Sequence, residues 1–234
     1  MICNRTLEEC MKLFSTEILE YIMQDKGIQK KEILPHDIMC KQIADYMMQP
    51  EVLERYFSCL SDDEIARLEY GIAEDLKNNR YEGSYEIPML LCQSEYAFRF
   101  SNKPEEEELF WLPYDVAEAF MNMKSDVFTE KRKSQNHFLS CLMAVDTFYG
   151  QVPLRILAPV MEKSVEEATE MITALPQELN HYIVNEEIVY HRDLYLEDCG
   201  LACEQKDVPY YIPDEEELEE LDYIHQVVLV EKFA

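Results

Sequence analysis

The chain has few basic residues, few glycines and no long apolar run. Its 234 residues include 48 acidic side chains and 21 lysines and arginines, so the formal charge is −27 with histidine neutral. Neutralising phosphates takes clustered Lys and Arg, and a field this negative repels a polyanion. The sequence therefore argues against nucleic-acid binding and against binding to an anionic membrane surface. Five glycines leave little room for phosphate-cradling loops, and no apolar run approaches the roughly 18 residues of a membrane span.

The N-terminus lacks the apolar core of a signal peptide, because charged residues appear from Arg5 onward. We therefore expect a cytoplasmic protein. Apolar residues make up 47% of the chain, enough to build a folded core. In a reducing compartment the eight cysteines are expected to be buried thiols rather than disulfides. The closely spaced Cys199 and Cys203 lack the second pair that zinc sites use, so no metal or other cofactor is predicted.

Helical spacing dominates the first third of the chain. Apolar residues recur at three- and four-residue steps and predict one helix that Thr6 opens, with Glu9 at its N3 position, and that Gly27 ends. Ser61 and Glu64 form a second capping-box pattern. Three more helices are predicted, over 36–48, 52–60 and 61–72.

An alternating pattern then predicts a β-hairpin with a long charged loop, from strands at 96–100 and 109–112. A helix over 115–123 follows. The polar stretch 124–135 carries the one locally basic run, Lys131 to Lys133. We interpret this stretch as a solvated junction between two domains.

The second half predicts three helices and a hairpin. The helices cover 137–149, 152–160 and 164–175, the last opened by Ser164 with Glu167 at N3. The hairpin strands are 182–184 and 188–190, joined by a turn at Asn185-Glu186, and an acidic helix is predicted over 214–221. Three helices followed by a hairpin is the order of a winged helix.

The two halves also share a hexamer pattern. Residues 110–115 and 210–215 both read aromatic, aromatic, aliphatic, Pro and then the start of an acidic helix. We therefore predict an α+β, mainly helical protein with an N-terminal helical region and two winged-helix-like modules. The predicted division is 1–123 for the helical region with the first module, 124–135 for the junction, and 136–234 for the second module with its acidic helix.

Three stretches carry a resemblance to known proteins: Asp146 to Leu154, the hairpin after Pro176, and Val208 to Asp214. On these stretches the chain resembles a group of largely uncharacterised bacterial cytoplasmic proteins with winged-helix-like modules, some of which carry a C-terminal SEC-C zinc motif. The resemblance implies a fold rather than an activity, because the matching motifs are structural. The Cys-x-Cys of the zinc motif is absent here, so zinc binding is not implied.

The charge of the second module indicates which kind of partner it can bind. Residues 164–191 contain six acids and no Lys or Arg. Base readout and phosphate anchoring rely mainly on Arg, Lys, Asn and Gln, so this surface would repel DNA. The segment 193–222 carries twelve acids against Lys206 alone, which makes it a candidate contact for a basic partner. Its predicted contact residues are Glu215, Glu216, Glu219 and Glu220.

Catalytic motifs are not found in the sequence. The five histidines lie far apart, and no metalloprotease, nucleophile-elbow or glycine-rich phosphate motif occurs. Trp111 either packs in the core of its hairpin or forms an exposed aromatic anchor for a partner. We therefore predict a non-enzymatic protein-interaction or regulatory module whose acidic surface contacts a basic protein. Two alternatives stay open: an acidic mimic of nucleic acid that occupies a DNA- or RNA-binding protein, and an enzyme with a dispersed site. The sequence leaves the oligomeric state open.

Overall fold

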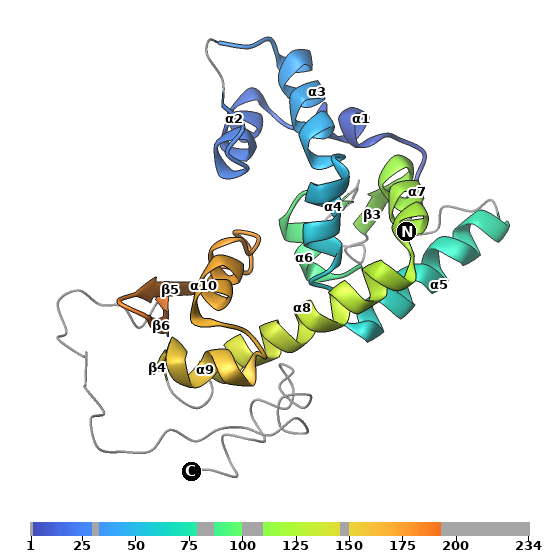
Figure 1. The fold of residues 1–234 in the computed structure, drawn as a ribbon. Coiled ribbons are helices and arrows are strands. Elements are labelled where there is room, and N and C mark those ends of the chain that lie inside the picture. The colour runs from blue at the N-terminus through green and yellow to red at the C-terminus, as the bar shows by residue number, and fades with distance from the viewer. Residues whose placement is uncertain (1, 30–32, 79–86, 100–109, 146–149, 193–234) are drawn as a thin grey trace, which may run out of the picture. The chain divides into compact units, whose positions relative to one another are not determined.

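The computed structural model divides the chain into two compact units, 1–132 (unit 1) and 133–234 (unit 2) (Figure 1). It describes residues 2–29, 33–78, 87–99, 110–145 and 150–192. These residues form a mainly helical α+β protein, and none of their helices has the length and apolarity that a membrane span requires. The division falls inside the polar stretch 124–135, through which helix α8 (Asp126–Ala144) runs unbroken.

Unit 1 surrounds a small three-stranded sheet with helices. The sheet has the order β1-β3-β2, with β1 parallel to β3 and β2 antiparallel to it. In chain order the elements are β1 (Ile2–Cys3), α1 (Leu7–Met11), α2 (Thr16–Asp25), α3 (His36–Met47), α4 (Pro50–Phe57), α5 (Asp62–Asn78), α6 (Met89–Gln93), β2 (Phe98–Arg99), β3 (Phe110–Pro113) and α7 (Tyr114–Met123).

The prediction of one helix from Thr6 to Gly27 is wrong, because the segment forms two helices. The Ser15 side chain accepts a hydrogen bond from the Ile18 N–H and so caps a new helix, α2, after α1 has ended. The expected ends are confirmed. Thr6 and Glu9 form a capping box at the start of α1, and Gly27, with φ +68°, follows α2 in a Schellman motif in which the Ile28 N–H bonds the Met23 carbonyl at 2.8 Å.

An aromatic cluster forms the centre of unit 1. The Tyr96 side chain is fully buried, and its hydroxyl donates to the Met47 carbonyl at the end of α3, at 2.7 Å. Its ring lies edge-on to Tyr56 and Phe57 of α4, with centroids 5.2 and 5.9 Å away. Phe57 in turn stacks on Phe120 of α7 at 5.0 Å. One residue outside any helix therefore joins α3 and α4, and through Phe57 reaches α7.

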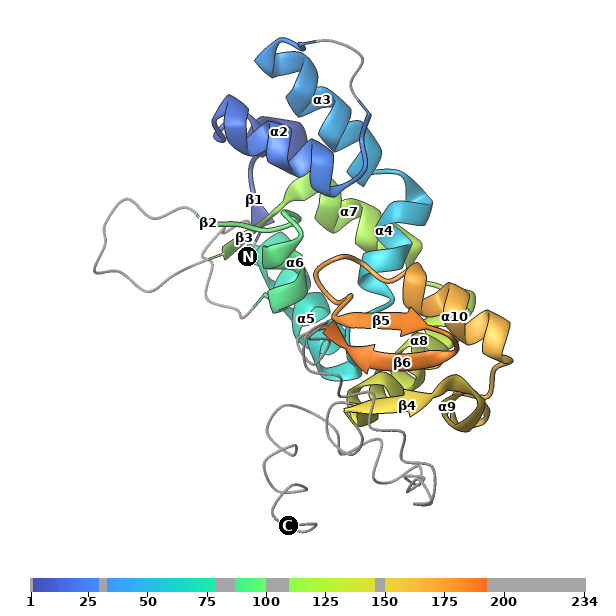
Figure 2. The same cartoon turned by 90° about the vertical axis from the view of Figure 1, so that its left-hand side faces the viewer.

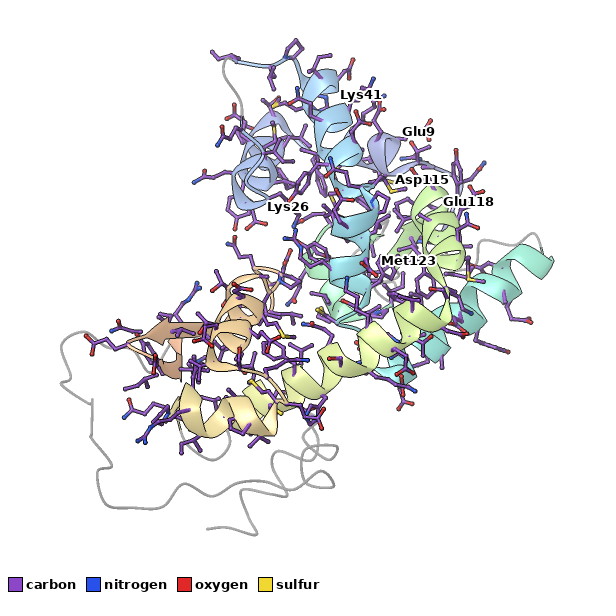
Figure 3. The ribbon with its side chains drawn as sticks, in the orientation of Figure 1. Glu9, Lys26, Lys41, Asp115, Glu118 and Met123 are labelled. Carbon is purple, nitrogen blue, oxygen red and sulfur yellow. The ribbon has the colours of Figure 1, made fainter. Side chains whose placement is uncertain are left out.

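The start of α1 is held by a carboxylate from α7. The Leu7 N–H donates to both Asp115 oxygens, at 2.9 and 3.1 Å, and the Val116 N–H donates to Oδ1 at 3.0 Å. Figure 3 shows Asp115 on α7 beside Glu9 of α1. Burial raises the pKa of Asp115 above its ordinary value of 3.8, although the Leu7 and Val116 N–H groups oppose the rise. Asp115 thus satisfies a helix-start N–H at the cost of burying a charge.

Replacing Asp115 by alanine is expected to lower the free energy of unfolding by about 1–3 kcal/mol, because the Leu7 N–H loses its acceptor. Asp115→Asn keeps an oxygen for both N–H groups and should cost less than about 1 kcal/mol. The folded state binds this proton more tightly than the unfolded state does. Ionisation of Asp115 therefore reduces stability as the pH rises through its folded pKa, and the Asn variant should lose that dependence. Urea unfolding near pH 4 and pH 7 tests this, and equal costs for Ala and Asn would contradict it.

The basic run in α8 makes contacts inside unit 1. Arg132 is 7% exposed, donates to the Leu60 carbonyl at 3.3 Å and pairs with Asp62 at the start of α5. Lys131 pairs with Glu54 of α4. The interpretation of this run as a solvated linker is therefore wrong for Arg132, which is buried, whereas the Lys131 side chain is exposed although it forms an ion pair.

Unit 2 packs two helices and the end of α8 around another three-stranded sheet. Its sheet has the order β4-β6-β5 and is antiparallel throughout, and Figure 2 shows the strands in view with α9 and α10 beside them. Val152 and Pro153, predicted to begin a helix, lie in a strand because Val152 pairs with Val189. The elements after α8 are β4 (Gln151–Pro153), α9 (Leu154–Val160), α10 (Val165–Thr173), β5 (Tyr182–Asn185) and β6 (Ile188–His191).

The core of unit 2 draws on every one of these helices and on the sheet. Phe138 and Leu142 of α8, Leu157 of α9, Ile172 of α10 and Val189 of β6 are buried together in one cluster. The rest of the predicted helix 137–149, from 146 onward, lies outside the described residues. This core fixes which side of α10 and of the hairpin faces water.

The two units repeat an order of elements and a spacing of buried residues. Apart from α6 in unit 1 and β4 in unit 2, each has a helix, a short helix, a Ser-capped helix and then an antiparallel strand pair, namely α3-α4-α5-β2-β3 and α8-α9-α10-β5-β6. The third strand differs, because β1 lies parallel to β3 whereas β4 lies antiparallel to β6. Four buried residues of unit 1 lie 101 positions before buried residues of unit 2. They are Leu53, Tyr56, Phe57 and Leu60, matching Leu154, Leu157, Ala158 and Met161.

A His-Cys pair one helical turn apart repeats at the same spacing. His36 Nε2–H donates to the Phe14 carbonyl at 2.9 Å, because a carbonyl oxygen can only accept, and Cys40 Sγ lies 3.7 Å from His36 Nδ1. In unit 2, His137 Nε2 lies 2.9 Å from the Val160 carbonyl, with Cys141 Sγ at 3.7 Å. Both histidines therefore tie a helix to a neighbouring turn. The hexamer pattern that first suggested two similar modules has its second copy outside the described residues.

Candidate protein-binding surface

Of the predicted contact residues, Trp111 lies in the part of the chain that the structure describes, and the four glutamates do not. Glu215, Glu216, Glu219 and Glu220 lie outside the described residues. Trp111 lies on β3 opposite Phe98 and is half-buried, and the neighbouring Tyr114 is 44% exposed. Trp111 is thus neither fully packed in the core nor fully presented to solvent.

Unit 2 exposes five carboxylates on α10 and on the turn between β5 and β6. Ala168 and Ile172 face the core, so Glu166 and Glu170, one turn apart, lie on the opposite side of α10. The full set is exposed, and we call it the unit 2 carboxylate set: Glu166, Glu167, Glu170, Glu186 and Glu187. The sequence showed that this stretch has no Lys or Arg, but it did not show that these acids share the outer side of one folded core.

The members of the set have different local roles. Glu167 accepts from the Ser164 N–H at 2.9 Å, and its own N–H donates to the Ser164 hydroxyl at 3.1 Å. The Ser164 backbone N–H and then its hydroxyl hold the pKa of Glu167 below its ordinary value. Within the described part of the chain, none of the other four makes an ion pair or a side-chain hydrogen bond. Their charges are therefore free to act on a partner.

The turn of the hairpin holds two of these acids in an unusual backbone conformation. Glu186 and Glu187 have φ values of 50° and 63°, and they form a two-residue loop because Asn185 pairs with Ile188. Both φ values are positive, as in the type I′ turn that normally prefers Asn-Gly. The turn predicted at Asn185-Glu186 is therefore wrong by one residue, since the pairing of Val184 with Val189 sets the register. Residues other than glycine adopt such φ values at a cost in free energy.

Replacing Glu186 by Asn and Glu187 by Gly is expected to raise the free energy of unfolding by about 1–2 kcal/mol, because both residues tolerate positive φ. The control replaces both glutamates by glutamine, which removes the same charge and leaves the backbone cost in place. Chemical denaturation followed by circular dichroism measures both variants. Equal stability of the two double variants would mean that the gain comes from charge and not from the backbone.

The turn is also fixed to the helical part of the unit. The Leu154 N–H, at the start of α9, donates to the Glu187 carbonyl at 2.7 Å. Helix α10 packs against β5 in the same unit. The hairpin turn therefore has a defined place relative to the helices that carry the rest of the unit 2 carboxylate set.

Two histidines of unit 2 lie close together in the folded hairpin. The rings of His181 and His191 lie 5.8 Å apart at the open end of the hairpin, where Tyr182 pairs with His191. The sequence did not predict this pair, because two residues ten positions apart come together only when the hairpin forms. Among the described residues no group of three His, Cys, Asp or Glu side chains is placed to hold a metal ion.

Comparison of the chain with known protein families, with curated proteins and with solved structures gives no match. The resemblance to bacterial winged-helix proteins therefore stays a prediction.

Proposed function

We propose that this chain is a protein-interaction module that binds a basic protein through the exposed carboxylates of unit 2. The observation that carries the proposal is the hairpin turn, where Glu186 and Glu187 occupy two positions that favour Asn and Gly. Charge is kept there at a cost in stability. Backbone strain kept at an exposed site is a reason to look for a function that needs those side chains.

The fold of unit 2 supports a winged-helix-like interpretation. Its order is helix, strand, helix, helix, strand, strand, and the first strand pairs with the last. In a winged helix the third helix and the hairpin flank the recognition surface, and these correspond to α10 and to β5 with β6. Unit 1 also has helices followed by an antiparallel strand pair, and its third strand, β1, pairs with β3, although β1 comes before the helices and lies parallel. Two winged-helix-like modules in one chain are therefore part of the proposal.

The charge of that surface indicates the chemistry of the partner. A recognition helix that binds nucleic acid presents Arg, Lys, Asn or Gln, whereas the exposed side of α10 presents Glu166 and Glu170. Complementary charge speeds association and excludes wrong partners, and it weakens as salt rises. A protein with a basic surface patch satisfies these requirements. A nucleic acid does not.

Affinity capture with the tagged full chain tests the proposal. Lysate is applied at low salt and eluted with a salt gradient, and both protein and nucleic acid are identified in each fraction. We expect a stoichiometric basic protein whose retention is lost when Glu166, Glu170, Glu186 and Glu187 are replaced by glutamine. A parallel variant with glutamine at 215, 216, 219 and 220 measures how much the predicted acidic helix contributes to retention of the partner.

Two outcomes would overturn the proposal. Direct retention of nucleic acid would contradict the charge argument, and retention of the same protein by the glutamine variant of α10 and the turn would remove those residues from it. Adding duplex DNA to the captured complex tests whether the chain occupies a nucleic-acid-binding site on its partner. Displacement by DNA would indicate that the acidic surface occupies a nucleic-acid-binding site on the partner, and resistance to DNA would indicate a separate protein contact.

A further inference from the structure

Two cysteines of unit 1 lie close together where β1 leads into α1. The Sγ atoms of Cys3 and Cys10 are 3.8 Å apart and hydrogen-bonded to each other. Cys10 is fully buried in α1, and Cys3 is 8% exposed on β1. Figure 3 shows the neighbouring Glu9 and Asp115 of the same region. Seven positions along the chain separate the two thiols, so the pairing arises from the fold of this segment.

The pair is chemically unequal. The hydrogen bond from the Cys10 thiol lowers the pKa of Cys3 more than burial raises it, and the Arg5 charge also lowers it. The same interaction with Cys3, together with burial, raises the pKa of Cys10. Of the two thiols, Cys3 is therefore the one whose ionisation its surroundings favour.

The remaining cysteines with resolved shifts differ from Cys3. Burial raises the pKa of Cys92 to about 11 and that of Cys141 to about 12. Burial also raises the pKa of Cys40. These three thiols are expected to stay protonated and unreactive near neutral pH. Cys141 is thus a buried thiol in the same chain with which Cys3 can be compared.

We propose that Cys3 and Cys10 form a dithiol site that hydrogen peroxide oxidises to a disulfide. The Cys3 thiolate attacks one peroxide oxygen and gives Cys3 sulfenic acid, while the second oxygen leaves as hydroxide and takes up a proton to become water. The Cys10 sulfur then attacks the sulfenic sulfur, and the Cys10 proton leaves with the hydroxyl group as a second water. Two thiols lose two electrons in total, and one peroxide gains them.

The position of Cys3 allows access for a reagent this small. Strand β1 has two residues and lies at the edge of its sheet, paired with β3 alone. Ile2 is buried and its N–H donates to Asp75 Oδ2 at 2.9 Å, so a reagent reaches Cys3 through local opening of this short strand, which does not require global unfolding. The Cys10 Sγ already lies 3.8 Å from the Cys3 Sγ, so the second step does not have to bring two distant thiols together.

The disulfide would strengthen a segment that already has fixed ends. The Tyr114 N–H donates to the Arg5 carbonyl at 3.1 Å, and the Leu7 N–H donates to Asp115. Both contacts attach residues between the cysteines to the start of α7. A covalent link from Cys3 to Cys10 would fasten β1 to this anchored segment and hold the third strand of the unit 1 sheet in place.

Peptide mapping of the full chain tests the proposal without any variant. Trypsin cleaves after Arg5 and Lys12, so Cys3 and Cys10 fall in separate peptides, 1–5 and 6–12. The reduced protein is treated with stoichiometric hydrogen peroxide, free thiols are blocked with N-ethylmaleimide, and the digest is analysed by mass spectrometry. We expect these two peptides to appear linked, to separate on reduction, and to lose free thiol at least about tenfold faster than the Cys141 peptide.

Variants separate the two steps. In Cys10→Ser the sulfenic acid at Cys3 has no partner and should accumulate, where dimedone traps it. In Cys3→Ser the Cys10 thiol should stay reduced, and Cys141→Ser should leave the linked product unchanged. The proposal is overturned if both thiols stay free in the wild type under conditions that oxidise other cysteines, or if Cys3 and Cys141 react at the same rate.

Discussion

Replacing Tyr96 by alanine is expected to lower the free energy of unfolding of unit 1 by about 3–5 kcal/mol, one of the two largest effects predicted for the chain. The Tyr96 ring is fully buried against Tyr56 and Phe57. Truncation leaves a cavity between α3 and α4 and removes the hydroxyl from the Met47 carbonyl. Tyr96→Phe keeps the ring and should cost only about 1 kcal/mol for the lost hydrogen bond.

Trp111 provides the measurement, because it is the only tryptophan in the chain and it lies on β3 of unit 1. Urea unfolding followed by its fluorescence therefore reports on unit 1. The control is Tyr70→Ala on α5, where the tyrosine is 61% exposed and the expected change is about 0.5 kcal/mol or less. A Tyr96→Ala protein as stable as the Tyr70→Ala protein would show that the aromatic cluster does not hold unit 1 together.

Replacing Glu166, Glu170, Glu186 and Glu187 by lysine is expected to weaken binding of the captured basic partner on the order of 100-fold at low salt. Four attractive contacts become repulsive, and all four side chains are exposed in the free protein, so the fold should not suffer. Equilibrium binding at low salt measures the loss. The difference between wild type and variant should shrink as salt rises, because screening weakens attraction and repulsion together.

A matched variant controls for net charge. Lysine at Asp45, Glu51, Glu118 and Asp126 gives the same change in total charge on exposed residues of unit 1. If overall charge alone governed binding, the two variants would lose the same affinity. The account predicts that the unit 1 variant loses much less, since its substitutions leave the unit 2 carboxylate set unchanged.

Local signals in the sequence predicted the ends of helices well. The capping boxes at Thr6, Ser61 and Ser164 are confirmed by reciprocal bonds to Glu9, Glu64 and Glu167. Each motif is formed by four consecutive residues within one turn of helix, so the local sequence is enough to predict it. One helix start was predicted late. The helix predicted over 52–60 begins two residues earlier, at Pro50, where the missing N–H of proline costs nothing.

Long-range pairing was not predicted, because it leaves little trace in a short segment. Ile2 and Cys3 form a strand that pairs with Leu112 and Pro113 from the far end of unit 1. Two residues cannot show the alternation that marks a strand. The sequence likewise did not predict the ion pair of Arg132 with Asp62 of α5 or the contact of Cys3 with Cys10, since each depends on a fold that brings separate segments together.

The candidate surface was predicted in part. The sequence showed that 164–191 carries acids and no basic residue, and this composition led to the expectation of a basic partner. It placed the contact residues at 215–220 instead, because that run has the higher density of charge. What marks Glu186 and Glu187 is their backbone conformation, which follows from the pairing of Asn185 with Ile188 and has no signature in composition.

Hydrogen exchange of the full chain, alone and bound to its captured basic partner, tests the central claim most directly. The account predicts slower exchange on binding along α10 and at the turn between β5 and β6, with little change in α2 and α3 of unit 1. Peptides covering 164–173 and 184–189 report the first region, and peptides covering 16–25 and 36–47 report the second. Protection confined to unit 1 or to 214–221, with α10 and the turn unchanged, would contradict the account.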